Sequence, residues 1–230
     1  VKESRERVRA VIKTLGLDYP ASRITVNLAP ADVRKEGPIY DLPIFLAVAA
    51  ATGAAPLPQP GCAFLGEMSL LGELRPASGV LPMAIALKNA GFHTLFLPAA
   101  NAPEATVVEG LTVYGVDRAD HLLRHLRGEA NLSPADASQA VAQRQEEVLD
   151  YSDVRGQALA KRAMEITAAG GHNILLIGPP GSGKSMLAKR LPSILPEMTM
   201  GEAMETTKLH SIAGVLPPGT PLITIRPFRA

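Results

Sequence analysis

The chain has 230 residues and a formal net charge of +1. Its 47% hydrophobic and 20% charged residues are typical of a globular protein with a sizeable core, divided into one large or two modest domains. The nearly balanced charge excludes bulk electrostatic attraction to nucleic acid or to a membrane, so either contact would need a local patch. Cys62 is the only cysteine, which excludes an intrachain disulfide and favours a reducing compartment, for which we expect the cytoplasm.

The first half of the chain alternates between helical and strand patterns. Ser4 is expected to cap a first helix that ends at Gly16, and Arg5, Arg9 and Lys13 form a basic stripe along it. The later patterns predict helices at 42–51, 80–90 and 119–126 and strands at 23–28, 63–65, 73–75, 94–97, 106–108 and 112–114, with 63–65 and 73–75 paired as a hairpin. This alternation indicates an α/β domain over residues 1–128.

Residues 42–66 carry no charge and would be long enough to cross a bilayer. Prolines and glycines interrupt the stretch, among them Pro43, Gly53 and Pro56. We therefore interpret it as a short buried helix followed by a loop and expect no membrane partner.

Polar residues dominate 129–150, which we interpret as a linker before a second domain at 151–230. Within this domain the pattern predicts a helix at 157–169 whose buried face holds Leu159, Ala163 and Ile166. An apolar strand is expected at 173–177 and a further helix at 184–191. The predicted fold class of the whole chain is thus α/β.

Between that strand and that helix lies the motif of a phosphate-binding loop: Gly, four residues, then Gly-Lys-Ser. Its glycines allow the backbone to wrap closely around phosphates, and its N–H groups form an anion nest. Lys184 is expected to contact the β- and γ-phosphates, and the Ser185 hydroxyl to ligate Mg²⁺. The motif therefore predicts binding of ATP or GTP through Gly178, Pro179, Pro180, Gly181, Ser182, Gly183, Lys184 and Ser185.

Hydrolysis would also need an acidic residue at the end of an apolar strand to hold Mg²⁺. After Ser185 no such strand follows, and Glu197, Glu202 and Glu205 lie in a polar stretch that contains methionines. We expect a chain cropped at both ends, which binds the nucleotide without hydrolysing it and contains no catalytic residue.

The residues around the loop resemble the opening of a magnesium-chelatase-type AAA+ domain. The similar segments are 153–157 (Asp-Val-Arg-Gly-Gln), 161–173, the loop itself, and Arg-Pro-Phe-Arg at 226–229. This resemblance implies ATP as the nucleotide, Asp153 and Val154 as residues near the adenine, and a ring, typically a hexamer, as the working form.

The first half is similar to the proteolytic domain of Lon at residues 35–38 and 65–80. Where that family has its catalytic serine this chain has Ile39, and where it has its catalytic lysine this chain has Leu81. Neither side chain can serve as nucleophile or base. Ser78 and Lys88 stand at other offsets, so the resemblance implies a Lon-like α+β domain without peptidase activity, followed by the start of a P-loop AAA+ α/β domain.

The order of the two domains resembles that of the ComM/YifB family. That resemblance implies DNA as the partner and branch migration during natural transformation as the role. Two alternatives stay open, a magnesium-chelatase subunit and an ATP-dependent protease-like protein with an inactive peptidase domain. The basic stripe of the first helix gives only weak support to DNA binding, because solvated charged faces are common.

His121 and His125 are four residues apart on a predicted helix, a spacing that metal ligands use. No third ligand lies at a suitable spacing around them. We interpret both as polar residues of a surface helix.

Overall fold

The computed structural model describes residues 2–20, 23–28, 37–136 and 149–228. It divides into two compact units: unit 1 is Val1–Ala142 with Lys208–Pro221, and unit 2 is Gln143–Thr207 with Leu222–Ala230. The division falls inside helix α9 (Met200–Ile212). Most of the predicted linker, residues 137–148, lies outside the described residues.

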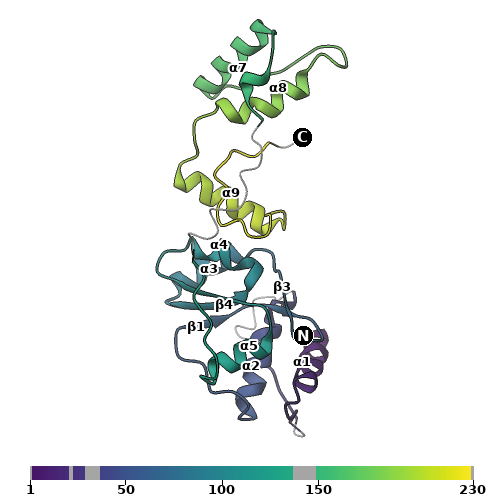
Figure 1. Ribbon diagram of the computed structural model, residues 1–230, viewed down its shortest axis with the longest axis vertical. Helices are drawn as coiled ribbons and strands as arrows, with labels where there is room; N and C mark the ends of the chain where they lie inside the picture. Colours follow the sequence, from purple (N-terminus) through teal and green to yellow (C-terminus); the bar gives the residue numbers. More distant parts are fainter. Residues whose placement is uncertain (1, 21–22, 29–36, 137–148, 229–230) are drawn as a thin grey trace. The chain divides into compact units, whose positions relative to one another are not determined.

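Unit 1 is built on a parallel sheet of order β1-β4-β5. Figure 1 shows α3 and α4 over one face of this sheet and α2 and α5 over the other. The strands are β1 (Cys62–Phe64), β4 (Thr94–Pro98) and β5 (Thr112–Val116), and the helices are α1 (Lys2–Thr14), α2 (Asp41–Ala51), α3 (Val80–Asn89), α4 (Ala102–Thr106) and α5 (Ala119–Leu126).

An aromatic ladder crosses the three strands. The register places Phe64 beside Phe96 and Phe96 beside Tyr114. Their rings stack with centroids 5.0 and 4.8 Å apart, and the buried Phe96 joins the core formed with α1, α2 and α5. Cross-strand aromatic pairs stabilise a sheet beyond the area that they bury.

A separate antiparallel hairpin pairs β2 (Glu67–Met68) with β3 (Leu74–Arg75). The predicted hairpin partner at 63–65 was therefore wrong, since most of that segment belongs to β1 in the parallel sheet. The Ser69 hydroxyl accepts the N–H groups of Leu71 and Glu73 and fixes the turn. Gly72 completes the turn with a φ of 82°, a conformation that favours glycine.

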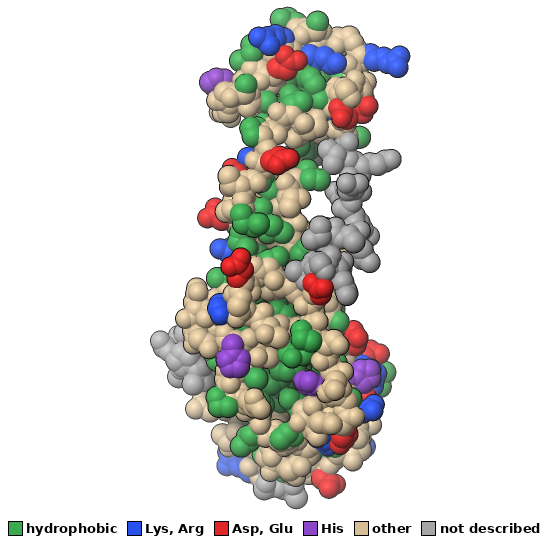
Figure 2. Space-filling view, turned by 60° about the vertical axis from the view of Figure 1, so that its left-hand side comes forward, with side chains coloured by type: hydrophobic (Ala, Val, Ile, Leu, Met, Phe, Trp, Pro, Cys, Tyr) green, Lys and Arg blue, Asp and Glu red, His purple; other side chains and the backbone are tan. Residues whose placement is uncertain are grey.

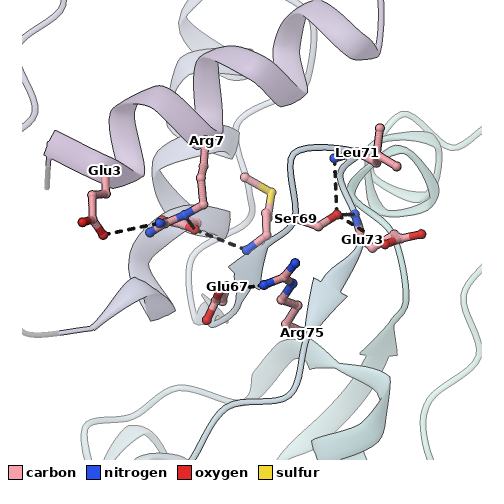
Figure 3. A network of polar contacts seen from close by, with 9 residues as sticks. Glu3, Arg7, Glu67, Ser69, Leu71, Glu73 and Arg75 are labelled. Carbon is pink, nitrogen blue, oxygen red and sulfur yellow. Dashed lines mark hydrogen bonds and ion pairs between the residues drawn. The ribbon is translucent and has the colours of Figure 1, made fainter.

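An ion pair with a fully buried carboxylate and a partly exposed arginine joins α1 to α2. Arg7 Nε donates to Asp41 Oδ2 (2.6 Å) and Arg7 Nη2 donates to Asp41 Oδ1 (3.2 Å), while the Met68 N–H also donates to this carboxylate (3.3 Å). The hydrogen bond to Asp41 is the main cause that raises the pKa of Arg7 above its ordinary value. Figure 3 shows Arg7 reaching from its helix toward the hairpin, where Glu67 and Arg75 form an ion pair across the two strands (3.7 Å).

Unit 2 has a small core around Tyr151, Val154, Met164 and Leu187. Burial raises the pKa of Tyr151, whose hydroxyl donates to the Lys161 carbonyl (2.6 Å). The elements that surround this core are η3 (Tyr151–Asp153), α7 (Ala158–Gly170), α8 (Lys184–Arg190) and η4 (Leu191–Ile194).

Three predicted strands are not strands. Residues 23–28 alternate in sequence and residues 173–177 form an apolar run, but no described strand pairs with either segment, and a strand exists only through its ladder partners. Residues 106–108 are the end of α4 and the turn after it, where Pro103 occupies the first helical turn and favours a helix.

Two details of the predicted helices also differ. Ser4 lies buried inside α1, which begins at Lys2, so it is not the helix cap. On α7 the predicted apolar face is exposed, with Leu159 88% and Ile166 51% accessible, because the described elements of unit 2 pack on the side of Met164 instead. The helices at 42–51, 80–90 and 119–126 are confirmed to within one residue at either end. Among the described residues no helix is both long and apolar enough to cross a membrane.

Candidate nucleotide-binding site

The phosphate loop bends through two glycines and is closed by its own lysine. Gly181 and Gly183 have φ angles of 80° and 83°, which other residues rarely adopt. Lys184 Nζ donates to the carbonyls of Gly178 (2.9 Å) and Pro179 (2.8 Å) and to the Ser182 hydroxyl (3.2 Å). The ammonium group therefore lies inside the curve of the loop, where a phosphate group would meet it.

Several backbone N–H groups of the loop have no acceptor among the described residues. Among the hydrogen bonds of the described residues, none involves the N–H groups of Gly181, Gly183, Lys184 or Ser185. Successive free N–H groups around a cation form an anion-binding nest. Because Ser185 is exposed beside them, its hydroxyl is accessible to a cation bound to that anion. The residues present thus fit a nucleotide with Mg²⁺.

The segment before the loop keeps a strand-like alternation without a ladder. Ile174 and Leu176 pack against the core of unit 2, whereas Leu175 and Ile177 are 80% and 87% exposed. This core positions the start of the loop from one side.

Residues 153–157 reach the loop from the chain before α7. Val154 is buried in the core of unit 2, and the Asp153 carboxylate pairs with Arg190 Nη2 at the end of α8 (3.6 Å). Just before them, Asp150 accepts the Ser152 N–H (2.7 Å), which lowers the pKa of Asp150. These contacts tie the segment to the helix that follows the phosphate loop.

Gln157 is a residue of the site that the sequence reasoning did not single out. Its φ of 52° makes it the one non-glycine residue with a positive φ in the described part of the chain. A Cβ built on Gly183 would lie 2.9 Å from Gln157 Nε2, so the two residues are in contact. Gln157 ends the Asp-Val-Arg-Gly-Gln segment, and this segment was the only sequence feature that could have pointed to it. Its positive φ has no signature in the sequence.

The acidic residues after the loop have structural roles. Glu202 Oε2 accepts the Thr199 N–H (2.8 Å) and caps α9, and Glu202 Oε1 pairs with Arg226 Nη2 (3.2 Å). The Thr199 N–H is the main cause that lowers the pKa of Glu202, with Arg226 second. Arg229, at the end of the predicted Arg-Pro-Phe-Arg segment, lies outside the described residues.

Unit 1 brings no serine and lysine together at the peptidase positions. Ile39 lies in the turn η1 (Pro38–Tyr40), and Leu81 is fully buried in the first turn of α3. Ser78 precedes this helix, whereas Lys88 lies near its end, about 15 Å further along the axis. Lys88 Nζ donates instead to the Gly110 carbonyl (2.7 Å).

The described histidines do not belong to a cluster that could hold a metal ion. Within the described ranges, no three His, Cys, Asp or Glu side chains come close enough to hold a metal ion. His125 packs against Tyr114 and Phe96, and its Nδ1 accepts the Leu132 N–H (3.2 Å).

The basic stripe of α1 is partly engaged. Arg5 pairs with Glu6 (3.0 Å), and the Arg9 guanidinium lies 5.4 Å from the centre of the Tyr19 ring. In unit 2, Figure 2 shows lysine and arginine side chains gathered at the end that holds α7 and α8. Basic side chains at this end would attract a polyphosphate.

Comparison with known proteins gives matches to both parts of the chain. The family described as subunit ChlI of Mg-chelatase matches residues 1–101, and the family described as magnesium chelatase, subunit ChlI, matches residues 150–230. The protein Rv2897c of Mycobacterium tuberculosis is 42% identical over the whole chain. The competence protein ComM of Haemophilus influenzae is 42% identical and the protein YifB of Escherichia coli 40% identical, each over 92% of the chain.

The chain spans less than half of each of these relatives: 46% of Rv2897c and 42% of both ComM and YifB. The two family matches fall on either side of the polar stretch that follows the first domain. Together with these relatives, they show that the chain belongs to the ComM/YifB family of magnesium-chelatase-like ATPases.

Proposed function

We propose that the chain is the ATP-binding part of an AAA+ ring ATPase of the ComM/YifB type, and that the whole cytoplasmic protein is a DNA branch-migration helicase. The observation that carries the ATP assignment is the phosphate loop, which presents free N–H groups around the ammonium of Lys184. Family membership supports ATP rather than GTP, and the name of the relative ComM, a competence protein, supports a role in natural transformation.

In this proposal each loop residue has a separate task. The N–H groups of Gly181 and Gly183 bind phosphate oxygens, and Lys184 exchanges its loop carbonyls for the β- and γ-phosphates. Ser185 ligates Mg²⁺, and Asp153 and Val154 lie near the adenine. Bound ATP with Mg²⁺ would supply the free energy that drives the ring. Glu202 is engaged as a helix cap and in an ion pair with Arg226, so it is not assigned to hydrolysis.

The Lon-like unit is inert in this proposal. Ile39 and Leu81 occupy the two dyad positions, and Ser78 and Lys88 lie at opposite ends of α3. Casein or a fluorogenic peptide should therefore remain uncleaved. Clear turnover that Ser78→Ala abolishes would refute an inert unit.

A magnesium-chelatase subunit is the second candidate, because both family descriptions name that enzyme. Such a subunit would act on a porphyrin together with other chelatase subunits, and DNA would not stimulate its ATPase. The Lon-like unit that precedes the phosphate loop favours the DNA helicase over the chelatase subunit.

The ATPase rate of the full-length protein, measured with and without DNA at low salt, separates the two candidates. A helicase should hydrolyse ATP severalfold faster with DNA, and Lys184→Ala should abolish both rates, because the loop loses the charge that faces the phosphates. A protein that neither binds DNA nor responds to it would exclude the helicase. A rate that Lys184→Ala leaves unchanged would exclude this loop as the site of ATP binding.

A further inference from the structure

A carboxylate on α4 is buried in unit 1 without a cation. Glu104 is 5% exposed, and no lysine, arginine or histidine of the described residues forms an ion pair with it. It accepts hydrogen bonds from three other groups: Asn101 Nδ2 at Oε1 (2.7 Å), and the Leu81 N–H (3.3 Å) and the Ser211 hydroxyl (2.7 Å) at Oε2.

Both oxygens of Glu104 accept hydrogen bonds from N–H groups, Oε1 from the Asn101 amide and Oε2 from the Leu81 backbone. The amide of Asn101 is fixed by Ala77, whose N–H it accepts (2.9 Å) and to whose carbonyl it donates (2.8 Å), so it can offer Glu104 only a donor. A glutamine in place of Glu104 would turn its own NH₂ group toward Asn101 or toward the Leu81 N–H. Either orientation leaves two donors facing each other.

The third donor comes from the segment 208–221, which belongs to unit 1 although it follows the phosphate loop in the chain. Ser211 is buried and is held twice, since its carbonyl also accepts the Gly79 N–H (2.9 Å). Three residues later, Gly214 has a φ of 68°, and a Cβ there would lie 2.9 Å from Ser78 Oγ. The body of unit 1 therefore contacts this segment at Ser211 and at Gly214.

A cavity of about 220 Å³ lies where the segment meets the body of unit 1. Ser78, Asn101 and Glu104 line it from the body of the unit, and Ser211, Gly214 and Pro217 line it from the segment. Around this cavity the segment is joined to the body of the unit by the hydrogen bonds of Ser211 with Glu104 and Gly79.

We propose that the Lon-like unit is a docking platform for residues 208–221, with the hydrogen bond between Glu104 and Ser211 as its latch. Leu81 occupies the position of the Lon lysine, and its N–H is one of the donors that hold Glu104 in place. The first turn of α3, which has Leu81 where Lon has its catalytic lysine, thus helps to bind residues 208–221. This role needs neither peptidase activity nor bound nucleotide.

Hydrogen exchange of the 230-residue chain without nucleotide, read out on peptides, tests the latch. Glu104→Gln and Ser211→Ala should each raise exchange in 208–221 by about tenfold, since each removes or mismatches a buried hydrogen bond to a charged group. Peptides from α2 and β4 should keep their protection. The double variant should show no more than the larger single effect. Glu109→Gln, an exposed glutamate of the same unit, is the matched control and should change nothing.

Two results would overturn the proposal. One is unchanged exchange in 208–221 for both Glu104→Gln and Ser211→Ala. The other is an equal rise across all peptides of unit 1, which would mean that these residues support the fold as a whole. Ser211→Ala keeps the test decisive should Glu104→Gln fail to fold, because it removes a single hydroxyl.

Discussion

The ion pair between Arg7 and Asp41 gives the sharpest stability prediction. Asp41 is fully buried and accepts two hydrogen bonds from Arg7 and one from the Met68 N–H. Arg7→Met keeps most of the apolar stem of the side chain but leaves the buried carboxylate with one donor. Breaking a buried pair costs about 3–5 kcal/mol, and we expect about 3 because the Arg7 side chain is 21% exposed and water screens part of the loss.

Asp41→Asn should cost less, about 1–2 kcal/mol, because it removes the buried charge and keeps an oxygen for a donor. Arg5→Met on the same helix is the matched control: its side chain is 72% exposed and pairs with Glu6, so its effect should stay within about 0.5 kcal/mol. Urea denaturation followed by far-ultraviolet circular dichroism measures all three. The reasoning is refuted if Arg7→Met costs no more than Arg5→Met.

Three further outcomes follow from the same geometry. Phe96→Ala should cost about 3–5 kcal/mol in urea denaturation, because it removes the middle ring of the aromatic ladder, and a loss below about 1 kcal/mol would contradict that role. The pKa of Glu202 is lower in the folded protein than the ordinary glutamate pKa of about 4.3. The stabilisation by its carboxylate is therefore complete above that ordinary pKa and is lost as the pH falls through the lower pKa of the folded state. Wild-type protein should therefore lose more stability in acid than Glu202→Gln does, and equal pH profiles would argue against the cap. Gly183→Ala should weaken ATP binding more than Gly181→Ala in an equilibrium titration, since both have a positive φ but only a Cβ at 183 meets Gln157; equal losses would leave backbone strain as the sole cause.

Local signals in the sequence were sufficient for much of the fold. The helix at 119–126 was predicted with its observed bounds, because its pattern is strongly amphipathic and Gly128 follows it. The strand predicted at 94–97 from an apolar run that stops at a proline is confirmed as β4. Such signals lie within a few residues of each other, so they can be recognised in the sequence without knowledge of the tertiary structure.

The errors concern partners that lie far apart in the chain. Residues 63–65 pair with β4 rather than with 73–75, a choice that depends on how helices cover the sheet. The alternation at 23–28 and the apolar run at 173–177 indicate an extended backbone but not a neighbour to pair with. The exposed face of α7 was missed because amphipathicity alone does not say which elements pack against a helix.

The same distinction applies to the candidate site. The phosphate loop is contiguous, so its spacing predicted it, and the structure gives the free N–H groups that suit it. The contact between Gln157 and Gly183 joins two segments and depends on an unusual backbone angle. The pairing of Glu104 with Ser211 spans 107 positions, and neither residue type signals such a partner.

Equilibrium binding of a fluorescent ATP analogue, with Mg²⁺, to the 230-residue chain tests ATP binding most directly. Wild-type protein should bind in a saturable way, and unlabelled ATP should displace the analogue. Lys184→Ala should bind at least tenfold more weakly, because a hydrogen bond to a charged group contributes about 1.5–3 kcal/mol. Saturable binding of equal strength in both proteins, or none in the wild type, would contradict the assignment of residues 178–185 as the ATP site.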